Sequence, residues 1–244
     1  MTHLQSFIKL RTLILFSLFL LLFKFSYGQS SKSEKRKIDT IPNVQTAKPL
    51  PKLRFGAQVG YGYRFERGLY PHDSGYPAIN DYSFKLKNGV SFGADLTYYF
   101  SKYMGAGIKY SGIYSQAKLS TAVFADAPEN AFCAPISEKI DIHYIGIFYA
   151  ARYFVIPHKH CILLNAGIGC IKYRNKMIYF TGFNGTFDET LDEATLAFSA
   201  EIGHDFLVTK SLAIGLQVST VIDLLIKRIN GSHIDVTLGL RFWK

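Results

Sequence analysis

The last thirteen residues, 232–244, alternate between two sets of side chains. One face carries Ile234, Val236, Leu238, Leu240 and Phe242, and the other carries His233, Asp235, Thr237, Gly239 and Arg241. A period of two is that of a β-strand. In a soluble protein the apolar face would point toward a core. In an outer-membrane barrel it would point toward lipid, and the polar face would line the lumen.

Similar alternation recurs from residue 53 onward and predicts eight strands, separated by turn-rich stretches. The expected strands cover approximately residues 53–65, 88–100, 103–117, 139–154, 160–173, 195–208, 211–227 and 232–243. They exceed the five or six residues of ordinary strands and reach the ~9–11 residues that a tilted strand needs to cross a bilayer.

The connections between these strands alternate in length. The first, third and fifth are long (residues 66–87, 118–138 and 174–194), the second, fourth and sixth are tight, and the seventh, residues 228–231, is a short exception. Tight turns at the end that holds both termini, and longer loops at the other, are typical of outer-membrane barrels. The sequence therefore predicts an all-β fold, an eight-stranded antiparallel up-and-down transmembrane β-barrel, over residues 53–244.

The polar face of these strands is rich in glycine and in charges of both signs. Glycine weakens a strand that faces water, but it makes room in a narrow eight-stranded lumen. The charges expected to face the lumen are Arg54, Arg64, Asp95, Lys109, Asp141, Arg152, Glu201, Asp205, Asp223, Asp235 and Arg241. Mixed charges can pair across a lumen, so we expect a closed polar core, with a selective ion path as the alternative.

The fourth expected strand breaks the alternation. Asp141 and His143 set one parity, whereas Ile145, Ile147 and Tyr149 suit the lipid face only if the faces switch. The pattern thus predicts a β-bulge near residues 144–146.

The N-terminus has the features of a secretory signal. Lys9 and Arg11 precede an apolar run over residues 13–23, and small residues lead to predicted cleavage before Gln29. Removing residues 1–28 lowers the net charge from +10 to +7. Residues 29–52, with a net charge of +4 and three prolines, are expected to form a flexible basic periplasmic tail.

The three cysteines give no predicted disulfide. Cys161 and Cys170 lie nine residues apart in one expected strand, roughly 30 Å at ~3.3 Å per residue, which is too far for a disulfide. Cys133 lies in a loop, where a free thiol is favoured over a bond to Cys170.

Residues 53–244 resemble the small eight-stranded outer-membrane barrels of Bacteroidetes, the PorT-like and OmpX-like porin family. The resemblance rests on Gly28-Gln29 at the end of the signal, on the segments FGAQVGYGYRF and FGADLTYYF, and on the terminal VTLGLRF. It implies a terminal signal for the barrel insertion machinery at Leu238, Leu240 and Phe242. Trp243 and Lys244 follow Phe242 and depart from that pattern. The resemblance carries no motif for a particular activity.

A lipid-modifying enzyme is the alternative from another class. It requires a nucleophile, a base and an orienting group within hydrogen-bond reach. Ser137, His143 and Asp141 are the best candidates, although a polar lumen rim contains the same residue types.

Metal and nucleic-acid sites find little support. His158, His160 and Cys161 crowd one turn without a fourth ligand, and the acidic residues Asp188, Glu189, Asp192 and Glu193 lack the glycine and spacing of a calcium loop. No phosphate-binding motif occurs, so we expect no cofactor and no nucleic-acid partner.

These observations predict a non-enzymatic integral protein of the cell outer membrane with a structural, adhesive or secretion-assembly role. Its expected partners are membrane lipid, the insertion machinery and a protein bound through the loops or the tail. A small-solute pore, and a soluble lipocalin-like carrier with reversed faces, remain as alternatives.

Overall fold

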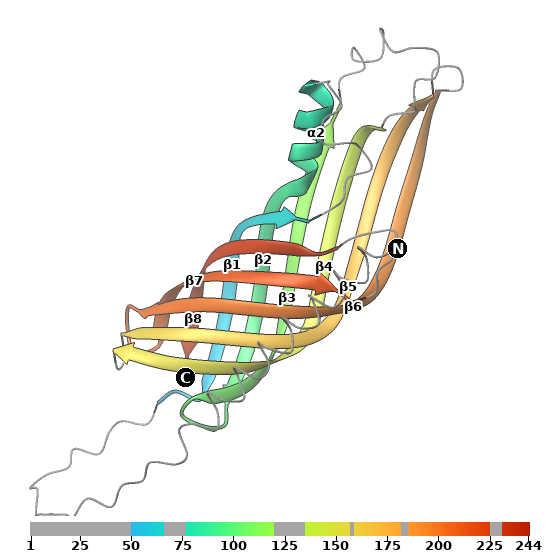
Figure 1. Cartoon of the computed structure of the whole chain (residues 1–244). Coiled ribbons are helices and arrows are strands. Elements are labelled where there is room, and N and C mark those ends of the chain that lie inside the picture. Colours follow the sequence, from blue (N-terminus) through green and yellow to red (C-terminus); the bar gives the residue numbers. More distant parts are fainter. Residues whose placement is uncertain (1–49, 66–76, 120–134, 157–158, 182–184, 225–230) are drawn as a thin grey trace, which may run out of the picture. The chain divides into compact units, whose positions relative to one another are not determined.

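The computed structural model describes residues 50–65, 77–119, 135–156, 159–181, 185–224 and 231–244. The predicted signal peptide, the predicted tail up to residue 49, Cys133 and His158 lie outside these ranges. Eight strands and one helix make up the described chain (Figure 1). They are β1 (Leu53–Arg64), α2 (Pro77–Lys87), β2 (Asn88–Tyr99), β3 (Met104–Lys118), β4 (Pro135–Ile156), β5 (His160–Thr181), β6 (Gly185–Leu207), β7 (Leu212–Asp223) and β8 (His233–Trp243).

The strands form a closed barrel in sequence order, and every neighbouring pair is antiparallel. β1 pairs with β2 on one side and with β8 on the other, so that Phe55 lies opposite both Leu96 and Phe242. The backbone of Lys244 accepts hydrogen bonds from Lys52 and Leu53, which joins the first and last described residues of the barrel. The predicted up-and-down barrel of eight strands is confirmed.

Polarity across the barrel wall is inverted relative to a soluble protein. Val59, Leu216 and Leu238 are 54–58% exposed on the outside, whereas Arg54 and Arg241 are at most 1% exposed in the lumen. Apolar side chains that face hydrocarbon and charges that pair inside the lumen both stabilise a barrel in a membrane. This distribution places the outer face of the barrel in lipid. Among the described residues, no helix is both long and apolar enough to span a membrane.

Three strands are longer than the alternation predicted. β4 and β5 have 22 residues and β6 has 23, against 11 or 12 in β1, β2, β7 and β8. β6 pairs with β7 only from Ala197 onward, but it pairs with β5 as far as Gly185. Most of the fifth connection, expected as a loop over residues 174–194, is therefore a hairpin.

We call the part of these strands that extends beyond the ring the projecting sheet; it comprises residues 135–144, 171–181 and 185–195. Its extra length is about 33 Å at ~3.3 Å per residue. Figure 1 shows β4, β5 and β6 continuing past the other strands, with α2 beside them.

The predicted bulge near residues 144–146 is wrong. β4 stays in register there with both neighbours, and its irregularities lie at Pro135/Ser137 and Phe154/Ile156. Even-numbered residues from Glu138 to Arg152 point inward throughout, so Asp141 faces outward rather than into the lumen. The apparent break in the pattern arises because the strand leaves lipid, which reverses the side chains that each face prefers.

The sequence analysis treated residues 66–87 as a loop and missed α2. Pro77 begins the helix, where its fixed φ is favourable, and Lys85 and Lys87 lie in the last turn, where cations suit the helix dipole. Tyr82 and Leu86, four residues apart, share its buried face. The helix packs mainly on β3 and runs directly into β2.

Candidate functional site

The central part of the lumen contains a layer of paired charges. The guanidinium of Arg54 donates through Nε to Asp205 at 3.0 Å and also forms an ion pair with Asp95. The second arginine, Arg241, lies 3.9 Å from Asp205 and donates to Gln58 at 2.6 Å. The charges are thus bound to one another rather than presented to a solute.

A second group in the same layer centres on Glu201. Lys109 donates to its Oε2 at 2.7 Å, and Asn165 donates to its Oε1 at 2.6 Å. Asp235 accepts a hydrogen bond from Ser219 at 2.7 Å. Because each of these carboxylates has a donor, the lumen can hold them away from bulk water.

Two glycines make room for this layer. A methyl group at Gly56 would collide with the Asp95 carboxylate, and one at Gly215 would collide with that of Asp205. The glycine-rich face seen in the sequence therefore has a local steric cause, because the charged side chains cross the space that a Cβ would fill.

An aromatic and aliphatic layer fills the barrel at the end that carries the described termini. It consists of Tyr99, Phe148, Ala150, Cys161, Leu163, Leu207, Ala213 and Trp243, with Phe154 packed against it. The Trp243 ring stacks on Tyr99, with 5.8 Å between centroids. Trp243, a departure from the expected terminal pattern, points inward and helps to close the barrel.

Arg152 completes this closure. Its guanidinium lies 3.8 Å from the centroid of the Tyr99 ring and donates to the carbonyl oxygens of Lys102 and Pro51 at 3.0 and 2.6 Å. Cation–π contact and carbonyl acceptors together replace the carboxylate partner that the sequence analysis expected for it.

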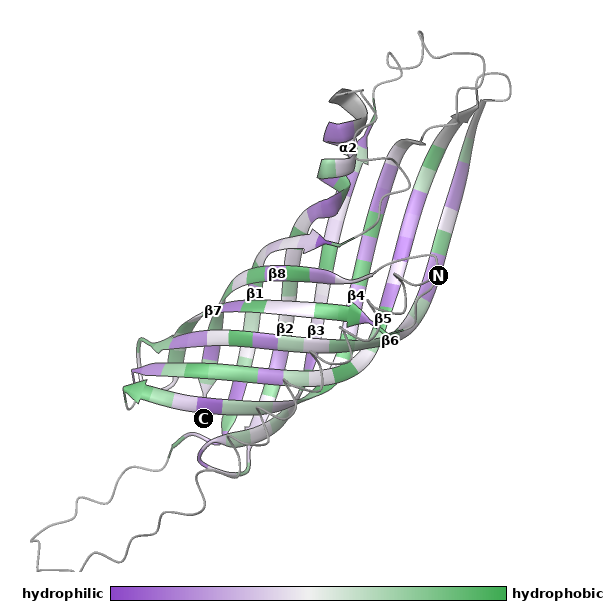
Figure 2. Cartoon of the chain, viewed as in Figure 1, coloured by the Kyte–Doolittle hydropathy of each residue, from purple (hydrophilic) through white to green (hydrophobic). Residues whose placement is uncertain are grey.

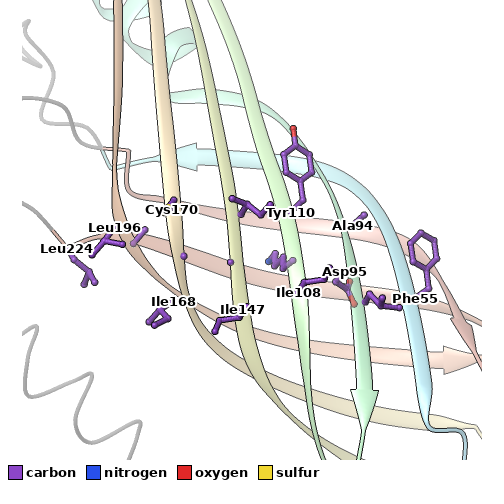
Figure 3. Close-up of a pocket in the computed structure, with 16 residues that line it drawn as sticks. Phe55, Ala94, Asp95, Ile108, Tyr110, Ile147, Ile168, Cys170, Leu196 and Leu224 are labelled. Atoms are coloured by element: carbon purple, nitrogen blue, oxygen red, sulfur yellow. The ribbon is translucent and has the colours of Figure 1, made fainter.

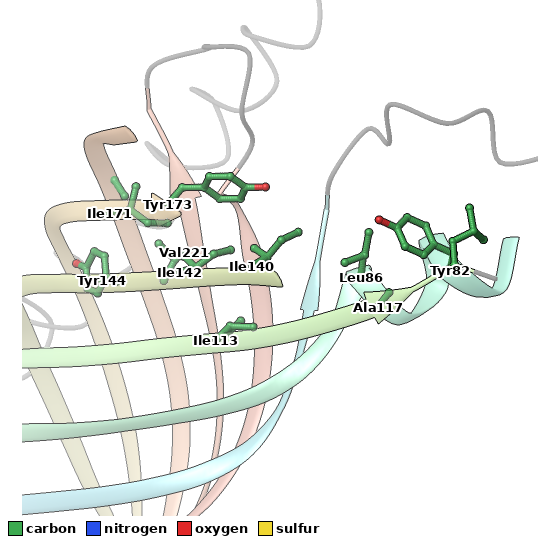
Figure 4. Packing of buried hydrophobic residues seen from close by; sticks show 12 residues of the cluster. Tyr82, Leu86, Ile113, Ala117, Ile140, Ile142, Tyr144, Ile171, Tyr173 and Val221 are labelled. Atoms are coloured by element: carbon green, nitrogen blue, oxygen red, sulfur yellow. The ribbon is translucent and has the colours of Figure 1, made fainter. Parts of the chain in front are cut away.

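A second apolar layer lies on the other side of the charges, toward α2 (Figure 4). It consists of Tyr82, Leu86, Ile113, Ala117, Leu119, Ile140, Ile142, Tyr144, Ile171, Tyr173, Ala197 and Val221. Ile140 and Ile142 are fully buried. The described lumen is therefore a polar layer enclosed between two apolar ones, and no sequence signal for this division was recognised.

The structure brings most of the predicted lumen residues together, but not all. Arg54, Asp95, Lys109, Glu201, Asp205, Asp235 and Arg241 are buried in the charged layer. Arg64 lies apart, where it donates to the Leu86 carbonyl at 3.2 Å and lies 5.4 Å from the Tyr173 ring. Asp223 is only half-buried, at the end of β7.

The projecting sheet is held to α2 by buried polar contacts. Tyr82 donates to Glu138 Oε2 at 2.8 Å, and Glu138 is only 6% exposed. Asn175 donates to the other oxygen of the same carboxylate. Glu138 is thus fixed by the helix on one side and by β5 on the other.

The outer face of the projecting sheet is charged. Lys172 pairs with Asp192 at 3.1 Å, and Lys176 pairs with Asp188 at 3.0 Å. Figure 2 shows hydrophilic residues alternating with hydrophobic ones along this part of β4, β5 and β6. The acidic residues considered for a calcium loop lie in β6, and two of them pair with lysines.

The residues considered for catalysis do not form a site. Ser137, Asp141 and His143 all lie at outward positions of β4. Six residues separate Ser137 from His143, roughly 20 Å along a strand, which is beyond any hydrogen bond. His143 instead contacts Tyr110, whose hydroxyl lies 2.8 Å from its Nδ1.

A hollow of about 780 Å³ lies on the outside of the barrel wall (Figure 3). The side chains that project into it are mainly aliphatic, among them Ile108, Ile147, Ile168 and Leu196, each more than half exposed. On a lipid-facing surface such a hollow accommodates acyl chains. Cys170, an exposed free cysteine of β5, and Tyr110 are also among its lining residues.

The three residues expected to form the insertion signal share the outer face of β8. Leu238, Leu240 and Phe242 are 48–57% exposed. They are available to a partner or to lipid, and the role of this face in insertion stays a prediction.

No protein-family model and no curated protein matches the chain. Solved structures with a similar arrangement include Ail of Yersinia pestis in complex with the heparin analogue sucrose octasulfate, at 12% identity, covering 79% of this chain and 98% of that one, with a TM-score of 0.46. Neisserial surface protein A matches at 11% identity over 78% and 96% of the two chains, with a TM-score of 0.47. The outer-membrane protein OprG of Pseudomonas aeruginosa matches at 9% identity over 80% and 97%, with a TM-score of 0.47. Identities this low transfer no ligand or partner.

Proposed function

We propose that this chain is an integral, non-enzymatic outer-membrane protein that binds a macromolecular partner through its projecting sheet. The observation that carries the proposal is the continuation of β4, β5 and β6 beyond the ring, supported by α2. A rigid barrel with an ordered extension is a suitable scaffold for presenting a binding surface to a partner. Membership of the PorT-like and OmpX-like group, and cleavage of residues 1–28, are parts of the same proposal.

The charge pattern of the projecting sheet supports a water-exposed working surface. Its outer face carries ion pairs with side chains about half exposed, such as Lys172 with Asp192. Exposed pairs of this kind add little stability, about 0–1 kcal/mol each. These lysine and aspartate side chains can instead form ion pairs with an incoming protein. In the described strands, the apolar outer wall of the barrel has no such groups to offer.

Adhesion of whole cells tests this role. Cells that display the full chain are compared with cells displaying a variant in which Asn-Gly replaces residues 177–189. Lys176 and Thr190 are cross-strand partners, so a two-residue turn can close the shortened hairpin. We expect the full chain to increase adhesion to surfaces coated with serum proteins, and the shortened variant, inserted at the same level, to lose that increase. Equal adhesion of the two strains would contradict the proposal.

The closed lumen argues against the pore alternative. Paired charges lie between two apolar layers, so an ion crossing the barrel would have to shed its water. We expect the full chain in planar bilayers to show no persistent conductance. Stable single-channel openings would favour the small-solute pore.

A further inference from the structure

Two histidines distant in sequence meet on the outer face of the barrel, near the end that carries the described termini. His160 begins β5, and His204 lies three residues before the end of β6. His160 pairs with Phe206, and Ile162 pairs with His204, so the two imidazoles are diagonal neighbours. Nδ1 of His160 lies 3.2 Å from Nε2 of His204, and the ring centroids are 5.3 Å apart.

These imidazoles are unusual for their surroundings. The outward residues beside them include Ile162, Phe206 and Leu216, all of which are apolar. A polar group on a lipid-facing wall is costly unless its hydrogen-bonding groups are satisfied. One N–H···N contact satisfies one nitrogen of each ring, and no other contact from a described residue reaches the remaining two nitrogens. One of the two facing nitrogens carries the proton of this contact, and a metal ion that displaces that proton would take its place between the rings.

The separation of the two nitrogens suits a shared metal ion. Zinc binds imidazole nitrogen at about 2.0–2.1 Å, so two tetrahedral ligands stand about 3.3 Å apart. The observed 3.2 Å is close to that value. The remaining nitrogens, Nε2 of His160 and Nδ1 of His204, would then carry the ring protons.

The His160 ring is also held by a neighbour. Its centroid lies 5.1 Å from that of Phe206, which limits rotation of the imidazole away from His204. A ligand pair that is already oriented loses less side-chain freedom when a metal binds.

We propose that His160 and His204 form a binding site for a divalent transition metal ion that prefers imidazole, namely Zn²⁺, Ni²⁺ or Cu²⁺. In the described part of the chain no group of three or more potential ligands is present. The protein thus supplies two ligands, and because the pair lies at the end of β5 and β6, water or headgroup phosphate oxygens can reach it and complete the coordination. Calcium and magnesium prefer oxygen ligands and are not expected to bind here.

This pairing differs from the one that the sequence suggested. His160 and Cys161 are adjacent in the chain, but Cys161 is fully buried in the lumen while His160 lies on the other side of the wall. The second ligand comes instead from a strand 44 residues away. Only the register of β5 against β6 brings it close.

Metal titration of the full chain, refolded in detergent micelles, tests the site. Binding of Cu²⁺ is followed by electron paramagnetic resonance, and binding of Zn²⁺ by calorimetry. We expect one ion per chain and a copper spectrum with two nitrogen ligands. We expect His160→Ala and His204→Ala each to weaken binding at least about tenfold, since even loss of an outer-shell partner costs 10–100-fold.

His143→Ala is the matched control. His143 is also on the outer face of a strand, in the projecting sheet, but it contacts Tyr110 rather than another histidine. It should bind metal as the unmodified chain does. If either alanine variant fails to fold, His160→Gln or His204→Gln keeps a polar side chain of similar size at the same position. Unchanged affinity in variants of both His160 and His204, or loss of binding in His143→Ala alone, would overturn the proposal.

Discussion

The barrel and the projecting sheet use the same strands in opposite ways. Along β4, Ile145 and Ile147 point outward in the barrel, where the outer face is apolar, and each is more than 60% exposed. Farther along the same face, Lys139 and Asp141 point outward in the projecting sheet, while Ile142 is buried on the inner face. The backbone parity is unchanged between the two regions. The chemistry inverts because the surrounding solvent changes from lipid to water.

β5 shows the same inversion. Ile168 is 59% exposed on the outer face of the barrel, whereas Lys172 and Lys176 occupy that face in the projecting sheet. On the inner face, Asn165 lies in the charged layer and Ile171 in the apolar one. Alternation alone therefore does not identify the inside of a strand; the medium outside must also be known.

The largest expected effect comes from the charged layer of the barrel. Arg54→Ala leaves Asp95 and Asp205 without this cation in a closed lumen, and removing one partner of a buried pair costs about 3–5 kcal/mol. Lys172→Ala removes an exposed pair in the projecting sheet and should cost about 0–1 kcal/mol. Urea unfolding of protein reconstituted in vesicles measures both. Equal losses would show that the lumen is open to water.

The second-largest effect is expected from a charge placed on the outer face, because this change should destabilise the barrel but not the projecting sheet. Ile147→Arg puts a cation in the lipid-facing band, where about 2–4 kcal/mol of folding free energy is lost near the bilayer midplane. Asp141→Arg, six residues away on the same face, should change the free energy of unfolding little, since that face meets water. The same unfolding assay compares the two variants. A similar loss for Asp141→Arg would mean that lipid extends along the projecting sheet.

The smallest expected effect concerns the junction of α2 with the projecting sheet. Tyr82→Phe removes one of the two donors to the buried Glu138 carboxylate and should cost about 1–3 kcal/mol. Because the contact is local, hydrogen exchange should rise in α2 and remain unchanged in β7 and β8. Faster exchange throughout the barrel would indicate that α2 supports the whole fold.

The sequence was sufficient for the barrel but not for its extension. Strict alternation and tight turns at one end predicted eight strands in the correct order. In residues 174–194, charges and apolar residues are exchanged between the two faces relative to the barrel. This stretch was therefore taken for a loop rather than for strands. α2 has a short apolar face formed by Tyr82 and Leu86, which is too little to predict a helix without its partner strands.

The composition of the lumen was predictable, but its partners were not. Alternation placed Arg54, Asp95 and Glu201 on one face, yet which carboxylate meets which cation depends on strand register and curvature. Asp141 was assigned to the lumen because its charge was taken to mark the inner face; parity with Ile145 and Ile147 places it on the outer face, since no bulge lies between them. The inward direction of Trp243 follows from parity with Arg241, a signal that was present in the sequence.

Accessibility scanning along β4 tests the inversion most directly. Single spin labels at Lys139, Ile140, Asp141, Ile142, His143, Ile145, Ile147 and Tyr149, in a chain with its cysteines replaced by alanine, report contact with oxygen in lipid or with a nickel chelate in water. We predict water contact up to His143, lipid contact from Ile145 onward, and neither at the buried Ile140 and Ile142. Nickel contact at Ile140 and Ile142, with Lys139 and Asp141 protected, would contradict the account.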